Sequence, residues 1–109
     1  MKIEIHFVGN DMTFEHIANV DAPEHYDVER ALEYAWGRVQ NCEGSWSQGE
    51  VVNGVDNPDY DPNIEVLVPL MEYDGHRYGF RSAMVGDRFV IDGKVYEVSS
   101  FGFDKISEV

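Results

Sequence analysis

Two short segments combine residue types that could bind a ligand or a protein partner. In residues 44–49 (GSWSQG), Trp46 stands between hydroxyl side chains and glycines. Residues 76–82 (HRYGFRS) carry an imidazole, two guanidinium groups, a phenol and a hydroxyl, on His76, Arg77, Tyr78, Arg81 and Ser82. Guanidinium groups beside aromatic rings suit an anion or a partner surface. If the fold brings the two segments together, these six side chains form a candidate binding site.

Both segments also have a simpler interpretation. A tryptophan in a long glycine-rich loop is more often an anchor that pins the loop to the domain than a ligand contact. Arginines in so acidic a chain can serve to neutralise neighbouring carboxylates. The sequence favours the anchor for Trp46 and leaves the role of the arginines open.

The four histidines do not predict a metal site. His6, His16, His25 and His76 stand far apart, without the short intervals that are typical of zinc ligands. His6 and His16 could meet across a hairpin, but strict strand alternation places their side chains on opposite faces of the sheet. We therefore expect ordinary exposed or hydrogen-bonded histidines.

Acidic residues in the middle of the chain could supply oxygen ligands to calcium, namely Asp56, Asp59, Asp61 and Glu65. Their spacing does not match an EF-hand loop, which also needs a tight-turn glycine where this chain has none. Cys42 has no second cysteine to pair with and is expected to be a free structural thiol. The chain has no P-loop, GxGxxG, HExxH, paired CxxC or GxSxG motif. We predict no catalytic residue, no metal and no cofactor.

Charge is the least ordinary property of the chain. Twenty-one acidic residues against eight basic ones give a formal net charge of −13 at pH 7. Such a surface repels nucleic acid and anionic membranes and attracts cationic partners. The acidity either keeps a small protein in solution or offers carboxylates to a basic partner, in the extreme case as a DNA mimic. The candidate mimic surface consists of Glu24, Glu29, Glu33 and Asp56.

The cysteine count and the apolar stretches of the sequence predict the cellular location. A single cysteine is more consistent with a reducing cytoplasm than with secretion. The first residues lack the apolar stretch of a signal peptide, and no run approaches the ~18 apolar residues of a membrane span. The expected location is the cytoplasm.

The elements that would position these residues indicate one α+β domain over residues 1–109. Residues 2–8 alternate as a half-buried strand, and residues 12–20 return as a second strand. Asp27 is placed to cap a helix whose apolar positions run from Val28 to Val39 at helical spacing. We expect a small antiparallel sheet, in ββα–loop–β–hairpin order, packed on this one main helix.

The second half of the chain reads as loops and strands. Residues 41–63 show no period and predict a long surface loop, a class that is often functional or mobile. Strand alternation resumes at residues 64–70, where Pro69 favours a strand end or a sheet edge. After a glycine-rich bend at residues 74–86, Asp92-Gly93 between two β-rich runs predicts a hairpin with a type I′ turn.

Several of these runs resemble small proteins encoded by bacteriophages, especially those of actinobacteria. The resemblance rests on residues 31–36 (ALEYAW), 44–47 (GSWS), 78–82 (YGFRS), 85–87 (VGD) and the later DG, Tyr96, Val98 and FGF positions. The phage pattern is approximately YGHRSTSxGD followed by DGxxYxVxxxGF, from which this chain departs at Phe80, Ala83 and Met84. The final quarter is also similar to the end of YodL-like domains. The resemblance implies a viral origin and expression in host cytoplasm, but no reaction.

Three classes of function follow. The first is a non-enzymatic phage accessory protein that binds or inhibits a host or phage macromolecule, with DNA mimicry as its most concrete form. The second is a small ligand-binding domain or enzyme that uses the Trp46 and Arg81 segments. The third is a self-associating structural protein that pairs copies along the edge strand at residues 64–70. Size, missing motifs and the phage resemblance favour the first class.

Overall fold

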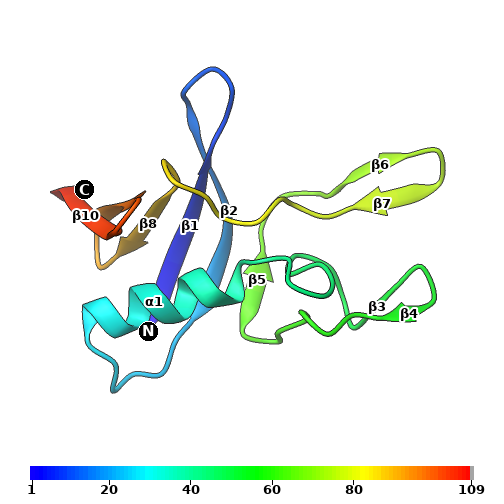
Figure 1. Cartoon of the computed structure of the whole chain (residues 1–109), viewed down its shortest axis with the longest axis horizontal. Helices are drawn as coiled ribbons and strands as arrows, with labels where there is room; N and C mark the ends of the chain where they lie inside the picture. The colour runs from blue at the N-terminus through cyan, green and yellow to red at the C-terminus, as the bar shows by residue number, and fades with distance from the viewer. Residues whose placement is uncertain (109) are drawn as a thin grey trace.

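An antiparallel six-stranded sheet forms the centre of the molecule (Figure 1). The computed structural model describes residues 1–108. The strands of this sheet are β1 (Lys2–Val8), β2 (Phe14–Asp21), β5 (Ile64–Val66), β8 (Arg88–Ile91), β9 (Lys94–Ser99) and β10 (Gly102–Glu108). Their spatial order is β10-β9-β8-β1-β2-β5. The predicted hairpins β1–β2 and β8–β9 are confirmed. The strand predicted at residues 64–70 is shorter, since β5 ends at Val66, and it lies at a sheet edge.

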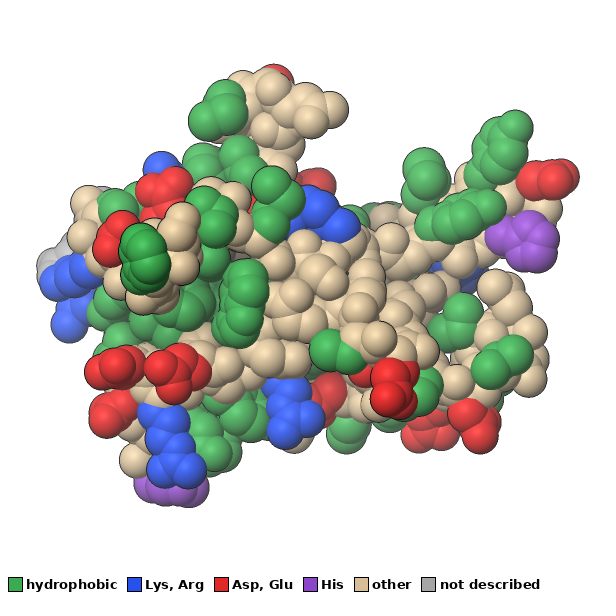
Figure 2. Space-filling view, viewed as in Figure 1, with side chains coloured by type: hydrophobic (Ala, Val, Ile, Leu, Met, Phe, Trp, Pro, Cys, Tyr) green, Lys and Arg blue, Asp and Glu red, His purple; other side chains and the backbone are tan. Residues whose placement is uncertain are grey.

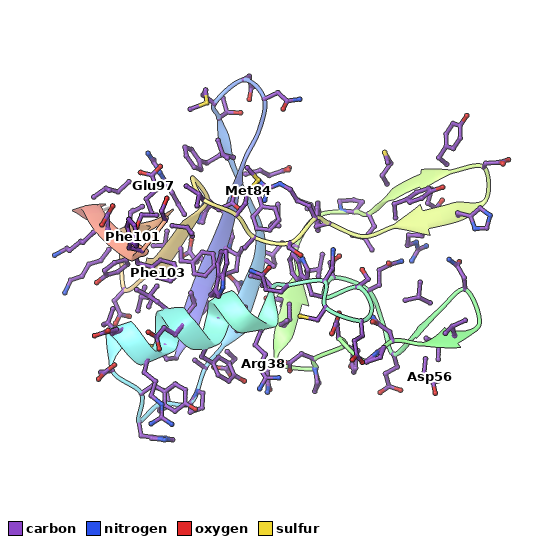
Figure 3. All side chains as sticks on the ribbon, viewed as in Figure 1. Arg38, Asp56, Met84, Glu97, Phe101 and Phe103 are labelled. Atoms are coloured by element: carbon purple, nitrogen blue, oxygen red, sulfur yellow. The ribbon has the colours of Figure 1, made fainter. Side chains whose placement is uncertain are left out.

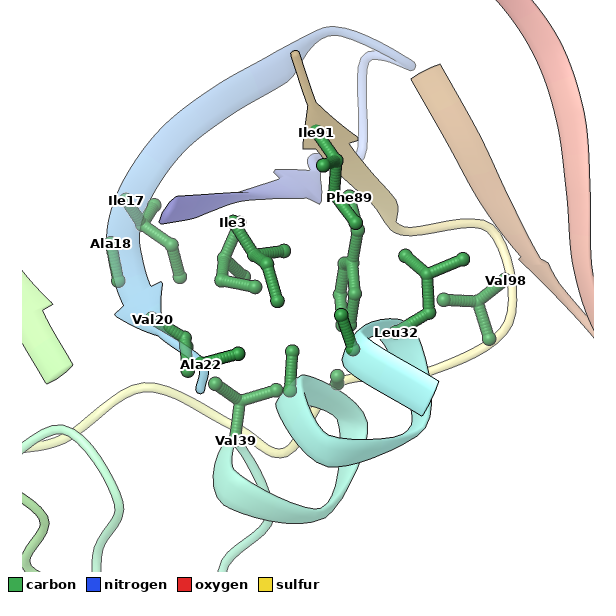
Figure 4. Close-up of a cluster of buried hydrophobic side chains, with 14 of the residues drawn as sticks. Ile3, Ile17, Ala18, Val20, Ala22, Leu32, Val39, Phe89, Ile91 and Val98 are labelled. Atoms are coloured by element: carbon green, nitrogen blue, oxygen red, sulfur yellow. The ribbon is translucent and has the colours of Figure 1, made fainter. Parts of the chain in front are cut away.

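One helix, α1 (Val28–Arg38), lies across one face of this sheet (Figure 1). Its first turn is capped as predicted, because the Asp27 carboxylate accepts a hydrogen bond from the Arg30 amide at 2.8 Å. Leu32 faces Phe89 and Val98 of the sheet in the close-up of the core (Figure 4). The other buried side chains of this core include Ile3, Ile5, Phe7, Ala18, Val20, Ala31, Ala35, Val39 and Ile91. The expected mixed architecture of one helix on an antiparallel sheet is confirmed.

The sheet is larger than the sequence predicted, and the chain contains more strands than the predicted order of elements. Residues 102–108 form the edge strand β10, which the predicted order of elements did not include. Two short hairpins also project from the same end of the molecule: β3 (Val51–Val52) with β4 (Val55–Asp56), and β6 (Met71–Tyr73) with β7 (His76–Tyr78) (Figure 1). No helix among residues 1–108 is long and apolar enough to cross a bilayer.

The two projecting hairpins turn at dipeptides of the type that marks the β8–β9 turn. Asn53 and Gly54 have φ of 50° and 80°, and Asp74 and Gly75 have φ of 54° and 78°. Asp92 and Gly93, at the turn that the sequence did predict, have φ of 50° and 77°. Positive φ at both central residues is the requirement of a type I′ turn, which Asn-Gly and Asp-Gly satisfy. The residues assigned to a featureless loop and bend therefore contained two further hairpin signals.

A β-bulge in β2 corrects the predicted placement of two histidines. Ile5 pairs with Ala18, but the next residue of β1, His6, pairs with His16, so that Ile17 is the extra residue of the bulge. A bulge shifts the alternation of one strand by one residue. His6 and His16 therefore lie on the same face of the sheet, with stacked rings whose centroids are 4.6 Å apart. The expectation that they lie on opposite faces is wrong.

The turn between β1 and β2 is held by the side chain of Asp11. Its Oδ1 accepts from the Thr13 hydroxyl at 2.6 Å and from the Thr13 amide at 3.1 Å. Because both bonds favour the ionised carboxylate, the hydroxyl bond most of all, they hold the pKa of Asp11 below its ordinary value.

The long segment between α1 and β5 is ordered by two polar side chains. The Asp59 carboxylate accepts from the amides of Cys42, Glu43 and Gly44 at 2.8–3.0 Å. The buried Asn57 side chain accepts from the Ser45 amide and donates to the carbonyls of Ser45 and Gly49. Asp59, a candidate calcium ligand by sequence, thus satisfies backbone amides of its own loop.

Candidate functional site

The Arg81 and Asp87 side chains form a two-bond ion pair at the centre of the segment that leads into β8. Arg81 Nη1 lies 2.7 Å from Asp87 Oδ2, and Nη2 lies 2.8 Å from Oδ1. The Asp87 side chain is completely buried. It also accepts from the amides of Val8 at 3.0 Å and Met84 at 2.8 Å. Both carboxylate oxygens therefore have two donors, as a buried charge requires.

The guanidinium group of Arg81 is used by the chain itself. Nη2 donates to the Val8 carbonyl at 3.2 Å, and Nη1 donates to the Ser82 carbonyl at 3.0 Å. Its central carbon lies 4.1 Å from the centre of the Phe7 ring. Arg81 and Asp87, which we call the Arg81–Asp87 clamp, thereby fasten residues 81–87 to the end of β1.

Trp46 is the anchor of the long loop, the interpretation that the sequence favoured. Its side chain is buried, and its indole Nε1 donates to the Arg81 carbonyl at 2.8 Å. Its ring stacks on Phe80 and meets Phe7 edge-on, with centroids 6.1 and 5.9 Å apart. Ser82 Oγ accepts from the Asn41 amide at 2.8 Å. The structure therefore brings Trp46, Arg81 and Ser82 together, in a joint that buries the indole.

The other three residues of the candidate site lie elsewhere. His76, Arg77 and Tyr78 form the exposed strand β7 of a projecting hairpin. The Arg77 guanidinium pairs with Glu72 of β6 at 3.0 Å. The link to the Trp46 loop is through the backbone, since Gln48 Nε2 donates to the Arg77 carbonyl at 3.1 Å.

Gly44 supports this joint because it leaves room for Asn57. A Cβ at position 44 would lie 2.1 Å from Asn57 Oδ1 and 3.2 Å from the Pro58 ring. Asn57 cannot move without losing the hydrogen bonds that order the loop. We expect Gly44→Ala to lower the free energy of unfolding by about 1–3 kcal/mol, measured by urea denaturation.

Gly49→Ala is the matched control for that prediction. A Cβ at position 49, in the same loop, meets no atom within 4 Å. Its free energy of unfolding should stay within about 0.5 kcal/mol of the unsubstituted protein. Equal losses in both variants would contradict the steric role of Gly44.

A groove lies between α1 and the turn that joins β9 to β10, with a volume of about 770 Å³. Trp36, Val85, Phe101 and Phe103 contribute apolar surface to it. Phe101 is fully exposed at the tip of the turn, above the half-buried Phe103 (Figure 3). Hydrophobic side chains gather on this side of the molecule in Figure 2, with acidic side chains beside them. We call this feature the α1–β10 groove.

Comparisons with known proteins identify no relative. No protein-family model, no curated protein and no solved structure matches the chain. The function is therefore inferred from the geometry of the chain itself.

The four acids of the candidate mimic surface are not gathered in one place. Glu29 and Glu33, one helical turn apart, line the α1–β10 groove. Glu24 precedes the helix and forms an ion pair with the amino terminus of Met1. Asp56 lies on the projecting β4, at the other end of the long axis (Figure 3). The structure thus brings two of the four acids to a recessed surface.

Sequence analysis did not single out two important residues, Asp87 of the Arg81–Asp87 clamp and Phe101 of the α1–β10 groove. Asp87 was noted only within a phage-like VGD run, and nothing in its local sequence indicates burial. Phe101 appeared only in the FGF positions of the phage-like pattern. Its neighbours Ser99, Ser100 and Gly102 form a typical turn composition, which could have indicated a phenylalanine displayed on a turn.

Proposed function

We propose that the chain is a non-enzymatic binding protein whose α1–β10 groove receives a segment of a partner protein. The observation that carries the proposal is a fully exposed phenylalanine, Phe101, on the rim of an apolar groove of about 770 Å³. An exposed aromatic ring that adjoins an apolar groove extends one contiguous apolar surface, and such surfaces are typical of interaction sites. A concave and mostly apolar groove fits a short peptide segment of a partner better than it fits a flat protein surface.

The charge beside the groove defines the chemistry of the partner. Glu29 and Glu33 place two carboxylates along its helical side and Lys105 lines its β10 side, in a chain of net charge −13. A segment that offers large apolar side chains flanked by lysine or arginine complements both features. This is a narrower form of the acidic-mimic hypothesis, in which only these two acids face the partner. The resemblance to phage-encoded proteins supports a partner from the phage or its host.

The alternative of a ligand site at Trp46 and Arg81 has less support from the geometry. The indole is buried, and the guanidinium group already binds Asp87 and the Val8 carbonyl. A ligand that used either group would have to displace these contacts. The groove needs no such displacement.

Replacing the exposed phenylalanine tests the proposal. A displayed library of random peptides, selected on the intact protein, should enrich peptides that combine a large apolar residue with flanking lysine or arginine. Phe101→Ser should weaken the enriched peptides by about 2 kcal/mol or more, about 30-fold in Kd, since a central aromatic is a typical hot spot. Its free energy of unfolding should change by less than about 0.5 kcal/mol, because the ring is exposed.

Tyr73→Ser is the matched control, since it removes an exposed aromatic ring from the projecting hairpin. It should leave peptide affinity unchanged. The double substitution Glu29→Gln and Glu33→Gln should reduce the dependence of affinity on salt concentration. Enriched peptides that bind Phe101→Ser as well as the unsubstituted protein would overturn the proposal.

A further inference from the structure

A cluster of three metal-ligating side chains lies on the face of the central sheet that α1 does not cover. Glu4 and His6 belong to β1, and His16 belongs to β2. His6 Nε2 lies 3.0 Å from Glu4 Oε1, and His16 Nδ1 lies 3.7 Å from the same oxygen. One ligand atom from each residue lies within 4.8 Å of the others. The three side chains are between about a quarter and a third exposed, so that an ion can reach them from solvent.

The bulge at Ile17 creates this cluster. Without it, His6 would face Ile17 and the ring of His16 would turn toward the core side of the sheet. Opposed residues of an antiparallel pair have Cβ atoms about 4.5–5.5 Å apart, close enough for two side chains to share one ion. Bulges that re-aim a side chain are common beside functional sites.

The side chain of Asn19, on the same strand as His16, orients the His16 ring. Asn19 Nδ2 donates to the Glu65 carboxylate of β5 at 3.2 Å, which turns Asn19 Oδ1 toward His16. Because that amide oxygen can only accept, His16 Nε2 must be the protonated nitrogen of the 2.7 Å contact between them. In a neutral ring of this tautomer Nδ1 is unprotonated, and it lies 3.7 Å from Glu4 Oε1, another acceptor. A cation between the two atoms resolves this opposition.

The donor set and spacing suit a divalent transition metal. Two imidazole nitrogens and one carboxylate oxygen are typical of zinc sites that keep a fourth position for water or another ligand. Zinc–ligand bonds of about 2.1 Å in tetrahedral geometry place ligand atoms about 3.4 Å apart. The distances of 3.0 and 3.7 Å from Glu4 bracket this value, and a rotation of the imidazole rings out of their stacked arrangement aims both nitrogen lone pairs at one ion. A ligating histidine commonly donates its other ring N–H to an oxygen acceptor that fixes the ring, which is the role of the Asn19 amide oxygen here.

The basic side chain of the neighbouring strand β8 is engaged with an aromatic ring. Arg88 on β8 pairs with His6 in the sheet register, but its guanidinium group lies 4.0 Å above the Phe14 ring. That stacking holds the guanidinium against an aromatic face.

From this geometry we propose that Glu4, His6 and His16 bind one divalent transition-metal ion of the zinc class and tie β1 to β2. Asn19 is a positioning residue that holds the His16 ring. The site is separate from the α1–β10 groove, on the other face of the sheet, and its occupancy does not depend on the proposed partner.

The proposal is tested by titrating the full chain with Zn²⁺ against a chromophoric chelator, in a Cys42→Ser background that removes the exposed thiol. We expect one equivalent of zinc to bind. His6→Gln and His16→Gln should each raise Kd by about 100-fold or more, and Asn19→Ala by about 10–100-fold, the usual cost of losing an orienting partner. His76→Gln removes an exposed histidine of β7 and should leave Kd unchanged.

A measurement on the unsubstituted protein keeps the test independent of how the variants fold. Addition of Zn²⁺ should shift amide resonances of β1 and β2 around Glu4, His6 and His16 and leave those of β6 and β7 in place. Cobalt in place of zinc should give the visible absorption of a tetrahedral nitrogen–oxygen site. The proposal is overturned if no saturable binding is observed, or if His6→Gln and His76→Gln bind zinc equally well.

Discussion

Replacing Asp87 by alanine is expected to lower the free energy of unfolding by about 3–5 kcal/mol. The substitution leaves the Arg81 guanidinium without its carboxylate and the amides of Val8 and Met84 without an acceptor. It also removes the contacts that hold residues 81–87 to the end of β1. The expected loss in the free energy of unfolding is therefore large for a single substitution. Urea denaturation followed by tryptophan fluorescence measures the loss.

Two further variants separate the buried ion pair from the removal of any carboxylate. Asp104→Ala, at an exposed position on β10, should change stability by less than about 0.5 kcal/mol. Combining Asp87→Ala with Arg81→Met should cost less than the sum of the single losses, by about 0.5–3 kcal/mol, because the unpaired charge is removed as well. Strict additivity would show that the two side chains do not act as a pair.

Trp46→Ala is the second substitution with a large expected effect, a loss of about 3–5 kcal/mol in the free energy of unfolding. It removes the ring that packs against Phe7 and Phe80, together with the bond to the Arg81 carbonyl. Amide hydrogen exchange should show the loss most strongly in residues 41–49, since their loop depends on this anchor. Denaturation and exchange measure the global and local effects separately.

Trp46→Phe distinguishes packing from hydrogen bonding. It keeps an aromatic ring in the joint but leaves the Arg81 carbonyl without its donor, at a cost of about 1–3 kcal/mol. Trp36→Phe, the same exchange at the half-buried tryptophan of α1, should cost less than Trp46→Phe and leave exchange in residues 41–49 unchanged. Faster exchange in that loop for Trp36→Phe would contradict the anchoring role of Trp46.

Local sequence predicted the elements whose signals lie within a few residues. The alternation of residues 2–8, the Asp27 cap with its apolar helical stripe, and the Asp92-Gly93 turn each act over short distances, and each appears in the structure. The hairpins at Asn53-Gly54 and Asp74-Gly75 have turn dipeptides of the same type, but the strands on either side of them are short. Their strands are only two and three residues long, too short for a periodic pattern.

The candidate site was predicted in part. Trp46 and Arg81 were singled out because their residue types are conspicuous, and the structure does bring them together. What they do could not be read from the sequence, because Arg81 is neutralised by a buried aspartate six positions away whose burial depends on β1. His76, Arg77 and Tyr78 were grouped with them by sequence proximity alone, and the hairpin carries them outward.

The sequence by itself determined an acidic chain with a helix on an antiparallel sheet, since charge, helical spacing and turn dipeptides are local properties. Tertiary structure decided three features that join distant residues. The Val8 amide meets Asp87 across 79 positions, the α1–β10 groove joins the helix to the last turn, and a one-residue bulge sets His6 beside His16. Each depends on strand register and on packing between segments far apart in the chain. A bulge of one residue moves the side chains that follow it to the other face of the sheet, and so changes which side chains meet.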